Sequence, residues 1–181
     1  MHRQKKPVSS PHTFVFSWRR FLQHCAIISI GVFFGLLSWY ISKPQTTRFY
    51  QTNAEQHQII AATAHIEIFL DENTAIAVTE SRPVQIELFK GSAYFETNGN
   101  ASNKLEVKVG TALIRDVGTR FRVNMLNDGS SNVAVEEGQV EIRVASGSHL
   151  ISAGEQANFD GLNIAEHQLV TETNIAPWRL E

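Results

Sequence analysis

Residues 84–96 have the sequence VQIELFKGSAYFE, in which apolar side chains recur at every second position on either side of Gly91. Successive side chains of a β-strand point to opposite faces, so a period of two predicts one buried and one exposed face. Gly91 interrupts the run where the chain would have to turn, and glycine tolerates the positive φ that such turns often need. We therefore predict a strand, a hairpin turn and a second strand.

The same period of two continues on both sides of this stretch. Further alternating segments, separated by turn residues, lie at residues 66–70, 76–78, 105–109, 121–123, 133–135 and 140–144. Short strands at close and regular spacing are typical of all-β domains. A weak internal repeat supports this interpretation, because the pattern of Ile86 to Phe95 returns 47 residues later in Val133 to Ile142, as stacked units would.

The N-terminal part of the chain contains one long uncharged run, residues 21–42. Twenty-two helical residues rise about 33 Å, close to the ~30 Å hydrocarbon core of a membrane. Arg19 and Arg20 precede the run, and the excess of bases on that side predicts a cytoplasmic N-terminus. We expect a basic cytoplasmic tail over 1–20, one transmembrane helix over 21–42 in the inner membrane of a diderm bacterium, and the bulk of the chain in the periplasm.

Other fates of this segment are less favoured by its residues. A cleaved signal peptide needs small residues at both the −3 and −1 positions of the cut, and residues 39–44 provide no such pair. Residues 17–22 partly match the twin-arginine export signal, but Phe21 follows the arginine pair directly, without the spacer residue of that signal. A lipoprotein anchor on Cys25 would require small residues before it, whereas Gln23 and His24 precede it. Because Cys25 is the only cysteine, no intramolecular disulfide can form.

Charge separates the two parts of the chain. Residues 1–42 carry five bases and no acid, whereas residues 43–181 carry 11 bases against 18 acids, a net charge of −7. An acidic body repels phosphates, which argues against a nucleic-acid partner. Residues 43–58 are polar and contain no long apolar run, which predicts a linker.

No pattern typical of catalysis is evident. The seven histidines are scattered without metal-ligand spacing, and the chain contains no phosphate loop or nucleophile motif. Glu136 and Glu137 are adjacent, so on a strand they would point to opposite faces and could not act on one bond. We interpret these two residues as solvated turn residues. The sequence therefore predicts no enzymatic activity, no metal site and no cofactor.

Four blocks in fixed order resemble the periplasmic domain of FecR-type regulators: VQIELFKGSAYFE, VGTALIRDVGTRFRV, VAVEEGQVEIRV and ISAGEQANFD. The family motif positions, which we interpret as structural, fall on Leu88, Gly91, Ala93, Phe95, Gly118, Thr119, Phe121, Val123, Val135, Gly138, Val140, Gly154, Glu155 and Gln156. Ala176-Pro177-Trp178-Arg179 resembles the Trp-Arg that follows the family domain. The resemblance places a FecR-like periplasmic β domain at residues 59–165.

The resemblance also implies a fold and a mechanism. The family fold is a twisted solenoid-like array of short antiparallel strands. Its members are single-pass anti-sigma regulators of cell-surface signalling, and those of the iron-citrate type control iron uptake. The periplasmic part senses the signalling domain of a TonB-dependent outer-membrane receptor, and the cytoplasmic part holds an extracytoplasmic-function (ECF) sigma factor.

The chain differs from the family pattern at both ends. The tail over 1–20 is shorter than the family's helical sigma-binding domain, and residues 166–181 would be only the start of its terminal α/β module. A start codon further upstream, a split gene or a reduced family member would each explain the difference. Possible cytoplasmic contacts within the tail are Phe16, Trp18, Arg19 and Arg20. Anchoring at the lipid surface is the favoured role for these residues, and a residual grip on a sigma factor is the alternative.

Two hypotheses about function follow from these observations. The first is a membrane-anchored periplasmic sensor and regulator that relays a receptor signal to an ECF sigma factor. The alternative is a membrane-tethered periplasmic binding or scaffold module without sigma-factor contact.

Overall fold

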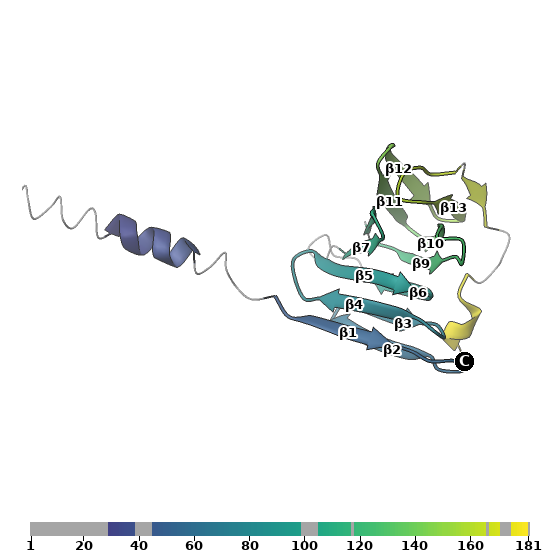
Figure 1. The fold of residues 1–181 in the computed structure, drawn as a ribbon, viewed down its shortest axis with the longest axis horizontal. Helices are drawn as coiled ribbons and strands as arrows, with labels where there is room; N and C mark the ends of the chain where they lie inside the picture. Colours follow the sequence, from purple (N-terminus) through teal and green to yellow (C-terminus); the bar gives the residue numbers. More distant parts are fainter. Residues whose placement is uncertain are drawn as a thin grey trace, which may run out of the picture. The chain divides into compact units, whose positions relative to one another are not determined.

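The computed structural model describes residues 29–38, 45–98, 105–116, 118–165, 167–170 and 175–180. The chain divides into two compact units, Met1–Pro44 and Gln45–Glu181. In the first unit, residues 29–38 are helical (Figure 1). The ends of the span predicted over 21–42, and the whole predicted tail over 1–20, lie outside the described residues. Within the described part of the chain, no helix is both long enough and apolar enough to cross a membrane.

Fourteen strands are described in the second unit, and they form two sheets of seven. Sheet A has the spatial order β1 (Thr47–Gln51), β4 (Ala75–Thr79), β5 (Val84–Lys90), β7 (Leu105–Val109), β8 (Ala112–Asp116), β11 (Gln139–Val144) and β12 (Gly147–Ser152). Sheet B has the order β2 (Gln58–Thr63), β3 (Ile66–Leu70), β6 (Ser92–Thr97), β9 (Arg120–Met125), β10 (Ser131–Glu137), β13 (Glu155–Phe159) and β14 (Gln168–Leu169). A short 3₁₀ helix, η1 (Pro177–Leu180), follows.

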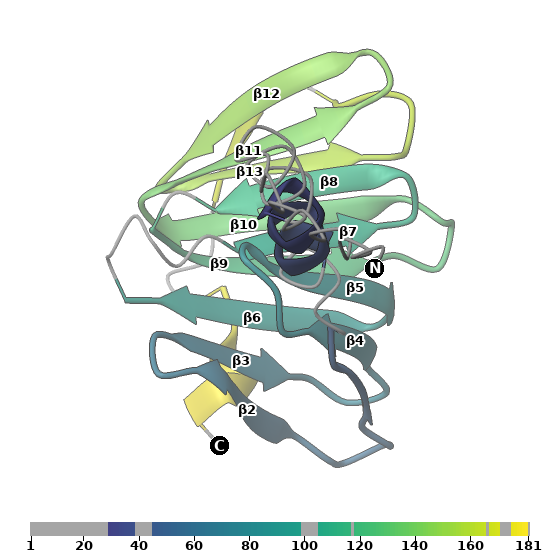
Figure 2. The same ribbon diagram turned by 90° about the vertical axis from the view of Figure 1, so that its left-hand side faces the viewer.

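Strand order within each sheet follows chain order from one end of the unit to the other. Figures 1 and 2 show this progression from blue strands β1 and β2 to the yellow-green strands β12 and β13. The chain crosses repeatedly between the sheets and adds one or two strands to each before it returns. The prediction of a predominantly β fold is confirmed, and the winding has the solenoid-like character that the resemblance implies.

The antiparallel arrangement fails at one place in the described sheets. β5 and β7 pair in parallel, with Val84 opposite Leu105 and Leu88 opposite Val109. The intervening strand β6 belongs to sheet B, so the chain makes one full turn before it returns to sheet A. Strands that are one full turn apart must run in the same direction. Every other strand pair in the described sheets is antiparallel.

The glycine turns of the internal repeat are corners between sheets, so the hairpin prediction is wrong at both. Gly91 joins β5 in sheet A to β6 in sheet B, and Gly138 joins β10 in sheet B to β11 in sheet A. Both glycines have a positive φ, +83° and +81°. Inward-facing residues stay in phase across each corner because both flanking strands point their apolar faces into the same core.

The two ends of the predicted domain also differ from expectation. Residues 43–58 were expected to form a linker, yet Thr47–Gln51 within them forms β1 and pairs with β4 along its whole length. Cross-strand hydrogen bonds stabilise β1 even though this segment has few apolar residues, and only Tyr50 packs against the core. Residues beyond 165 likewise belong to the same compact unit, through β14 and η1.

The hydrophobic core lies between the two sheets. Inward-facing positions of both sheets contribute aliphatic side chains, and the largest buried pair is Phe95 on β6 and Phe121 on β9. These two residues are directly opposite in the strand register, and their rings stack with centroids 5.0 Å apart. Such pairs contribute beyond simple area burial, typically by about 0.5–1.5 kcal/mol. The core leaves the two outer sheet faces available for other contacts.

Candidate functional site

The apolar motif positions lie in the core and not at a site. Leu88 on β5 and Val140 on β11 contribute from sheet A, and both are at most 1% exposed. The remaining apolar motif residues are fully buried in sheet B: Ala93, Phe95, Phe121, Val123 and Val135. These residues therefore build the scaffold and have no free surface for a partner.

The polar motif positions lie at corners between the sheets. The backbone N–H of Thr119 donates to Oγ1 of Thr97 over 2.7 Å, and the Thr119 hydroxyl donates to the Asp116 carboxylate. Asp116 also accepts from the Gly118 N–H at 2.9 Å. Buried polar groups need such partners because an unpaired one costs about 1–3 kcal/mol. This corner is therefore a structural hydrogen-bond network.

The last motif block forms the corner between β12 and β13. Gly154 donates its N–H to the carbonyl oxygen of Val135 over 2.9 Å. Glu155 accepts from the Ser152 N–H at 2.8 Å, and Gln156 pairs with Ala134 in the strand register. The possible cytoplasmic contacts Phe16, Trp18, Arg19 and Arg20 lie outside the described residues.

The outer face of sheet B carries a second apolar cluster, separate from the core. Tyr94 on β6 and Ala134 on β10 form its floor, with Phe69 on β3 packed beside them. Residues Ile175 to Arg179, which we call the C-terminal strap, lie over this floor; Ile175 and Ala176 are buried there. Figures 1 and 2 show η1, in yellow, beside the sheet B strands near β3.

Arg179 is the charged centre of this cluster, with a side chain only 15% exposed. Its guanidinium lies 4.3 Å from the centroid of the Tyr94 ring. Its Nη1 lies 2.9 Å from Glu96 Oε1 and 3.7 Å from Glu136 Oε2. A planar guanidinium can stack on an aromatic ring and bind carboxylates at the same time, which the ammonium of lysine cannot do equally well.

Tyr94 links the floor of the cluster to the same acidic group. Its hydroxyl donates to Glu136 Oε2 over 2.7 Å, and its ring is fully buried. Burial raises the pKa of Tyr94 well above its usual range, and the hydrogen bond to Glu136 and the charge of Glu136 raise it further. Tyr94 is therefore a neutral donor at all physiological pH values.

Two further contacts hold the strap. Arg122 on β9 donates from Nη1 to the carbonyl oxygen of Ile175 over 2.5 Å. The indole of Trp178 stacks on the His57 imidazole, with centroids 5.7 Å apart and planes 9° apart. The strap therefore touches residues that lie 53 and 121 positions earlier in the chain.

The interpretation of Glu136 and Glu137 as solvated turn residues is wrong for Glu136, which lies on β10 in the strap cluster. Glu137, the last residue of β10 before the Gly138 corner, is solvated as predicted and pairs with Arg120 on the neighbouring strand. Sequence reasoning missed the cluster because Tyr94, Glu136 and Arg179 come from three distant segments. The resemblance of Trp178-Arg179 to a family motif was the one signal that pointed to it.

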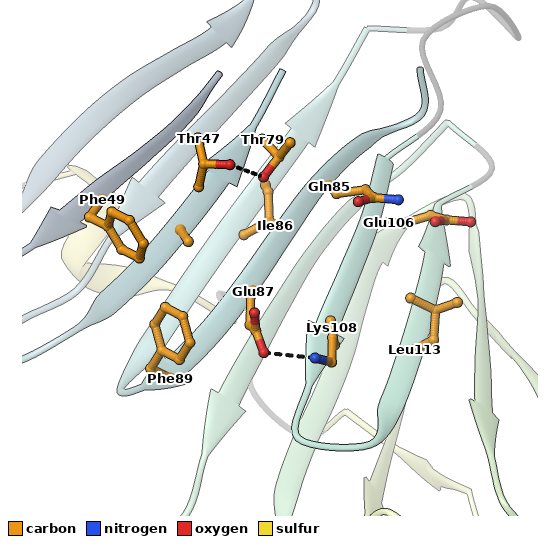
Figure 3. Close-up of a pocket in the computed structure, with 11 residues that line it drawn as sticks. Thr47, Phe49, Thr79, Gln85, Ile86, Glu87, Phe89, Glu106, Lys108 and Leu113 are labelled. Atoms are coloured by element: carbon orange, nitrogen blue, oxygen red, sulfur yellow. Dashed lines mark hydrogen bonds and ion pairs between the residues drawn. The ribbon is translucent and has the colours of Figure 1, made fainter. Parts of the chain in front are cut away.

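The outer face of sheet A carries a groove of about 470 Å³ (Figure 3). Phe49 on β1 and Phe89 on β5 stack at its apolar end, with ring centroids 6.5 Å apart, and both side chains are exposed. At its polar end, Lys108 Nζ lies 2.9 Å from Glu87 Oε1. Exposed aromatic rings beside paired charges suit the recognition of a partner surface more than a chemical reaction.

The described residues contain no group of three or more histidine, cysteine, aspartate or glutamate side chains placed to hold a metal ion. The two outer faces are candidate recognition surfaces because of what they present: an open groove with exposed aromatic rings on sheet A and a strap-covered cluster on sheet B.

Comparisons with known proteins agree with this fold. Two crystal structures of a proposed anti-sigma factor from Parabacteroides distasonis ATCC 8503 superimpose with TM-scores of 0.61 and 0.64, each at 18% sequence identity. They cover 68% and 72% of this chain, which spans 60% and 64% of their length. No curated protein matches the chain. The family model described as FecR protein matches residues 48–141, more than half of the sequence, and the chain belongs to the FecR family.

Proposed function

We propose that this chain is a membrane-anchored FecR-type regulator that senses a signal in the periplasm and controls an ECF sigma factor. The observation that carries the proposal is the FecR match over residues 48–141. The likeness of the fold to a proposed anti-sigma factor supports it at the level of architecture. The uncharged run over residues 21–42, preceded by Arg19 and Arg20, supports a membrane anchor and a cytoplasmic tail.

In this proposal the β domain receives the signal. A solenoid-like domain offers two outer sheet faces, and here one face is open and the other is covered by the chain itself. The open groove on sheet A would take the signalling domain of an outer-membrane receptor, because aromatic side chains such as Phe49 and Phe89 are enriched in the centres of protein interfaces.

The direct test is deletion of the gene in its own bacterium, followed by RNA sequencing. An anti-sigma regulator restrains its sigma factor, so we expect transcripts of one ECF regulon to rise and to return on complementation with the full chain. A chain carrying Phe16→Ala and Trp18→Ala should complement as well as the parent if the tail serves only as an anchor.

Unchanged transcription in the deletion strain, with and without an iron-limiting stimulus, would contradict the proposal. The alternative, a periplasmic binding or scaffold module, would then be favoured by the exposed Phe49–Phe89 pair. In that case Phe49→Ala would impair capture of an envelope component without any transcriptional effect.

A further inference from the structure

The C-terminal strap fills a site that is built like a peptide-binding site. Four strands of sheet B contribute side chains to it, and the strap lies across them. Its floor and walls are formed by Phe69, Tyr94, Glu96, Arg122, Ala134 and Glu136. This set combines aromatic surface, two carboxylates and one donor for a backbone carbonyl.

Each of these features has a matching group on the strap. Ile175 and Ala176 pack on the apolar floor, and Arg122 donates a hydrogen bond to the carbonyl oxygen of Ile175. The carboxylates of Glu96 and Glu136 form ion pairs with the guanidinium of Arg179. Charge-assisted contacts of this kind are among the strongest hydrogen bonds that peptides use in recognition.

The acidic side of the site needs a cation. In the strand register Glu96 is directly opposite Glu67 on β3 and Arg120 on β9. Arg120 forms its ion pair with Glu137, and the like charges of Glu96 and Glu67 destabilise the sheet. Glu136 accepts a hydrogen bond from the buried Tyr94 hydroxyl. Arg179 supplies positive charge between Glu96 and Glu136 and stacks on the Tyr94 ring as well.

The strap is attached in a way that allows exchange. Among the described residues, positions 175–180 join neither sheet as a strand, and their regular structure is the four-residue helix η1. A 3₁₀ helix of that length has little stability of its own. A segment that is held mainly by side-chain contacts, without a strand ladder, can open locally without global unfolding.

We propose that the outer face of sheet B is a binding site for a peptide segment in which an aromatic residue precedes an arginine. In this structure the site is occupied in cis by the strap, and a partner segment of the same chemistry would replace the strap. The inference concerns the β domain alone, so it holds whether or not the chain regulates a sigma factor.

The strap itself supplies the probe for the experiment. Residues 45–181 form a compact unit with their own core, and Trp178 is the only tryptophan in that unit. A fluorescein-labelled synthetic peptide of residues 174–181 is titrated, by fluorescence anisotropy, into three forms of the domain: 45–173, 45–181 carrying Arg179→Ala, and unaltered 45–181.

We expect the peptide to bind 45–173 and the Arg179→Ala domain, and to bind unaltered 45–181 much more weakly because the tethered strap competes at high effective concentration. An Arg179→Ala peptide should bind roughly tenfold or more weakly, as expected for the loss of a charge-assisted contact. In the domain, Glu136→Gln should have a similar effect, and the matched control Glu141→Gln on sheet A, a carboxylate of similar exposure, should have none.

The 45–173 fragment lacks the strap and therefore loses the stability that the strap contacts contribute. If that fragment fails to fold, the Arg179→Ala domain carries the test. Absence of peptide binding to a folded Arg179→Ala domain would overturn the proposal. Binding that is insensitive to both Arg179 and Glu136 would overturn it as well. A second measurement is acrylamide quenching of Trp178 in unaltered 45–181: quenching should increase when an unlabelled peptide carrying Trp178→Phe is added, so that the domain holds the only tryptophan, and an unchanged signal at saturating peptide would contradict exchange of the strap.

Discussion

At the scale of single residues, the corners between the sheets set the tightest constraints. A Cβ atom built on Gly138 would lie 2.5 Å from the carbonyl oxygen of Gly118 and 2.7 Å from Cγ2 of Thr119. The φ of Gly138 is +81°, a value that L side chains rarely adopt. Gly138 is therefore required for two reasons: its backbone has a positive φ, and the corner at Gly118 and Thr119 lies too close to leave room for a side chain.

The first prediction separates these two demands. Gly129, in the turn between β9 and β10, has a similar φ of +85° but nothing within 4 Å of a built Cβ. Gly129→Ala should therefore show the conformational cost alone, about 1–2 kcal/mol. Gly138→Ala should lower the free energy of unfolding of residues 45–181 by clearly more, measured by urea denaturation. Equal losses in the two variants would show that the close approach at Gly138 is relieved without cost.

At the scale of elements, the neighbouring strands β6 and β9 of sheet B use both of their faces. Phe95 on β6 and Phe121 on β9 face the core from adjacent strands, and the flanking outward positions Tyr94 and Arg122 serve the strap. One pair of strands thus contributes to the core with one face and to the recognition site with the other. A loss of packing between β6 and β9 would disturb both.

The second prediction tests this pair. Phe121→Ala should lower the free energy of unfolding of residues 45–181 by about 3–5 kcal/mol, because a fully buried ring leaves a cavity. Phe89→Ala is the matched control: its ring is 47% exposed and stacks on Phe49, so its loss should cost no more than about 1 kcal/mol. Both are measured by urea denaturation. If the Phe121→Ala domain had the same urea midpoint of unfolding as the parent domain, this ring would contribute little to the stability of the core.

At the scale of the whole molecule, the chain consists of two units with different expected surroundings. The Gln45–Glu181 unit has an acidic surface and a β core, whereas the Met1–Pro44 unit contains the five N-terminal bases and the uncharged run over 21–42. Each unit would be poorly suited to the environment of the other, because an apolar run favours lipid and the net charge of −8 of residues 45–181 favours water.

The third prediction concerns the orientation of the chain. A reporter enzyme that is active only in the periplasm should be active when it is fused after Glu181 and silent when it is fused after Trp18. The physical reason is the excess of Arg and Lys before the uncharged run, which is retained in the cytoplasm. The opposite pattern of activity would reverse the proposed topology, and activity in neither fusion would contradict export of the β domain.

Much of the fold could be predicted from residue pattern. The period of two in residues 84–88 and 105–109 correctly indicates which side chains are buried, because the inward and outward faces of a strand are a local property. The candidate site on sheet B could not be predicted in this way. Tyr94, Glu136 and Arg179 are separated by 42 and 43 positions, and nothing local to any of them indicates the other two.

The sequence by itself determined the fold class, the buried face of most strands and the family motifs. Only the tertiary structure decided that Gly91 and Gly138 are corners between sheets, that β5 and β7 run parallel, and that Glu136 lies beside Tyr94 and Arg179. The physical reason is that side-chain alternation specifies which face of a strand is buried but not which strand lies beside it. Strand neighbours depend on how the whole chain winds around one core, and that choice is a property of all the strands together.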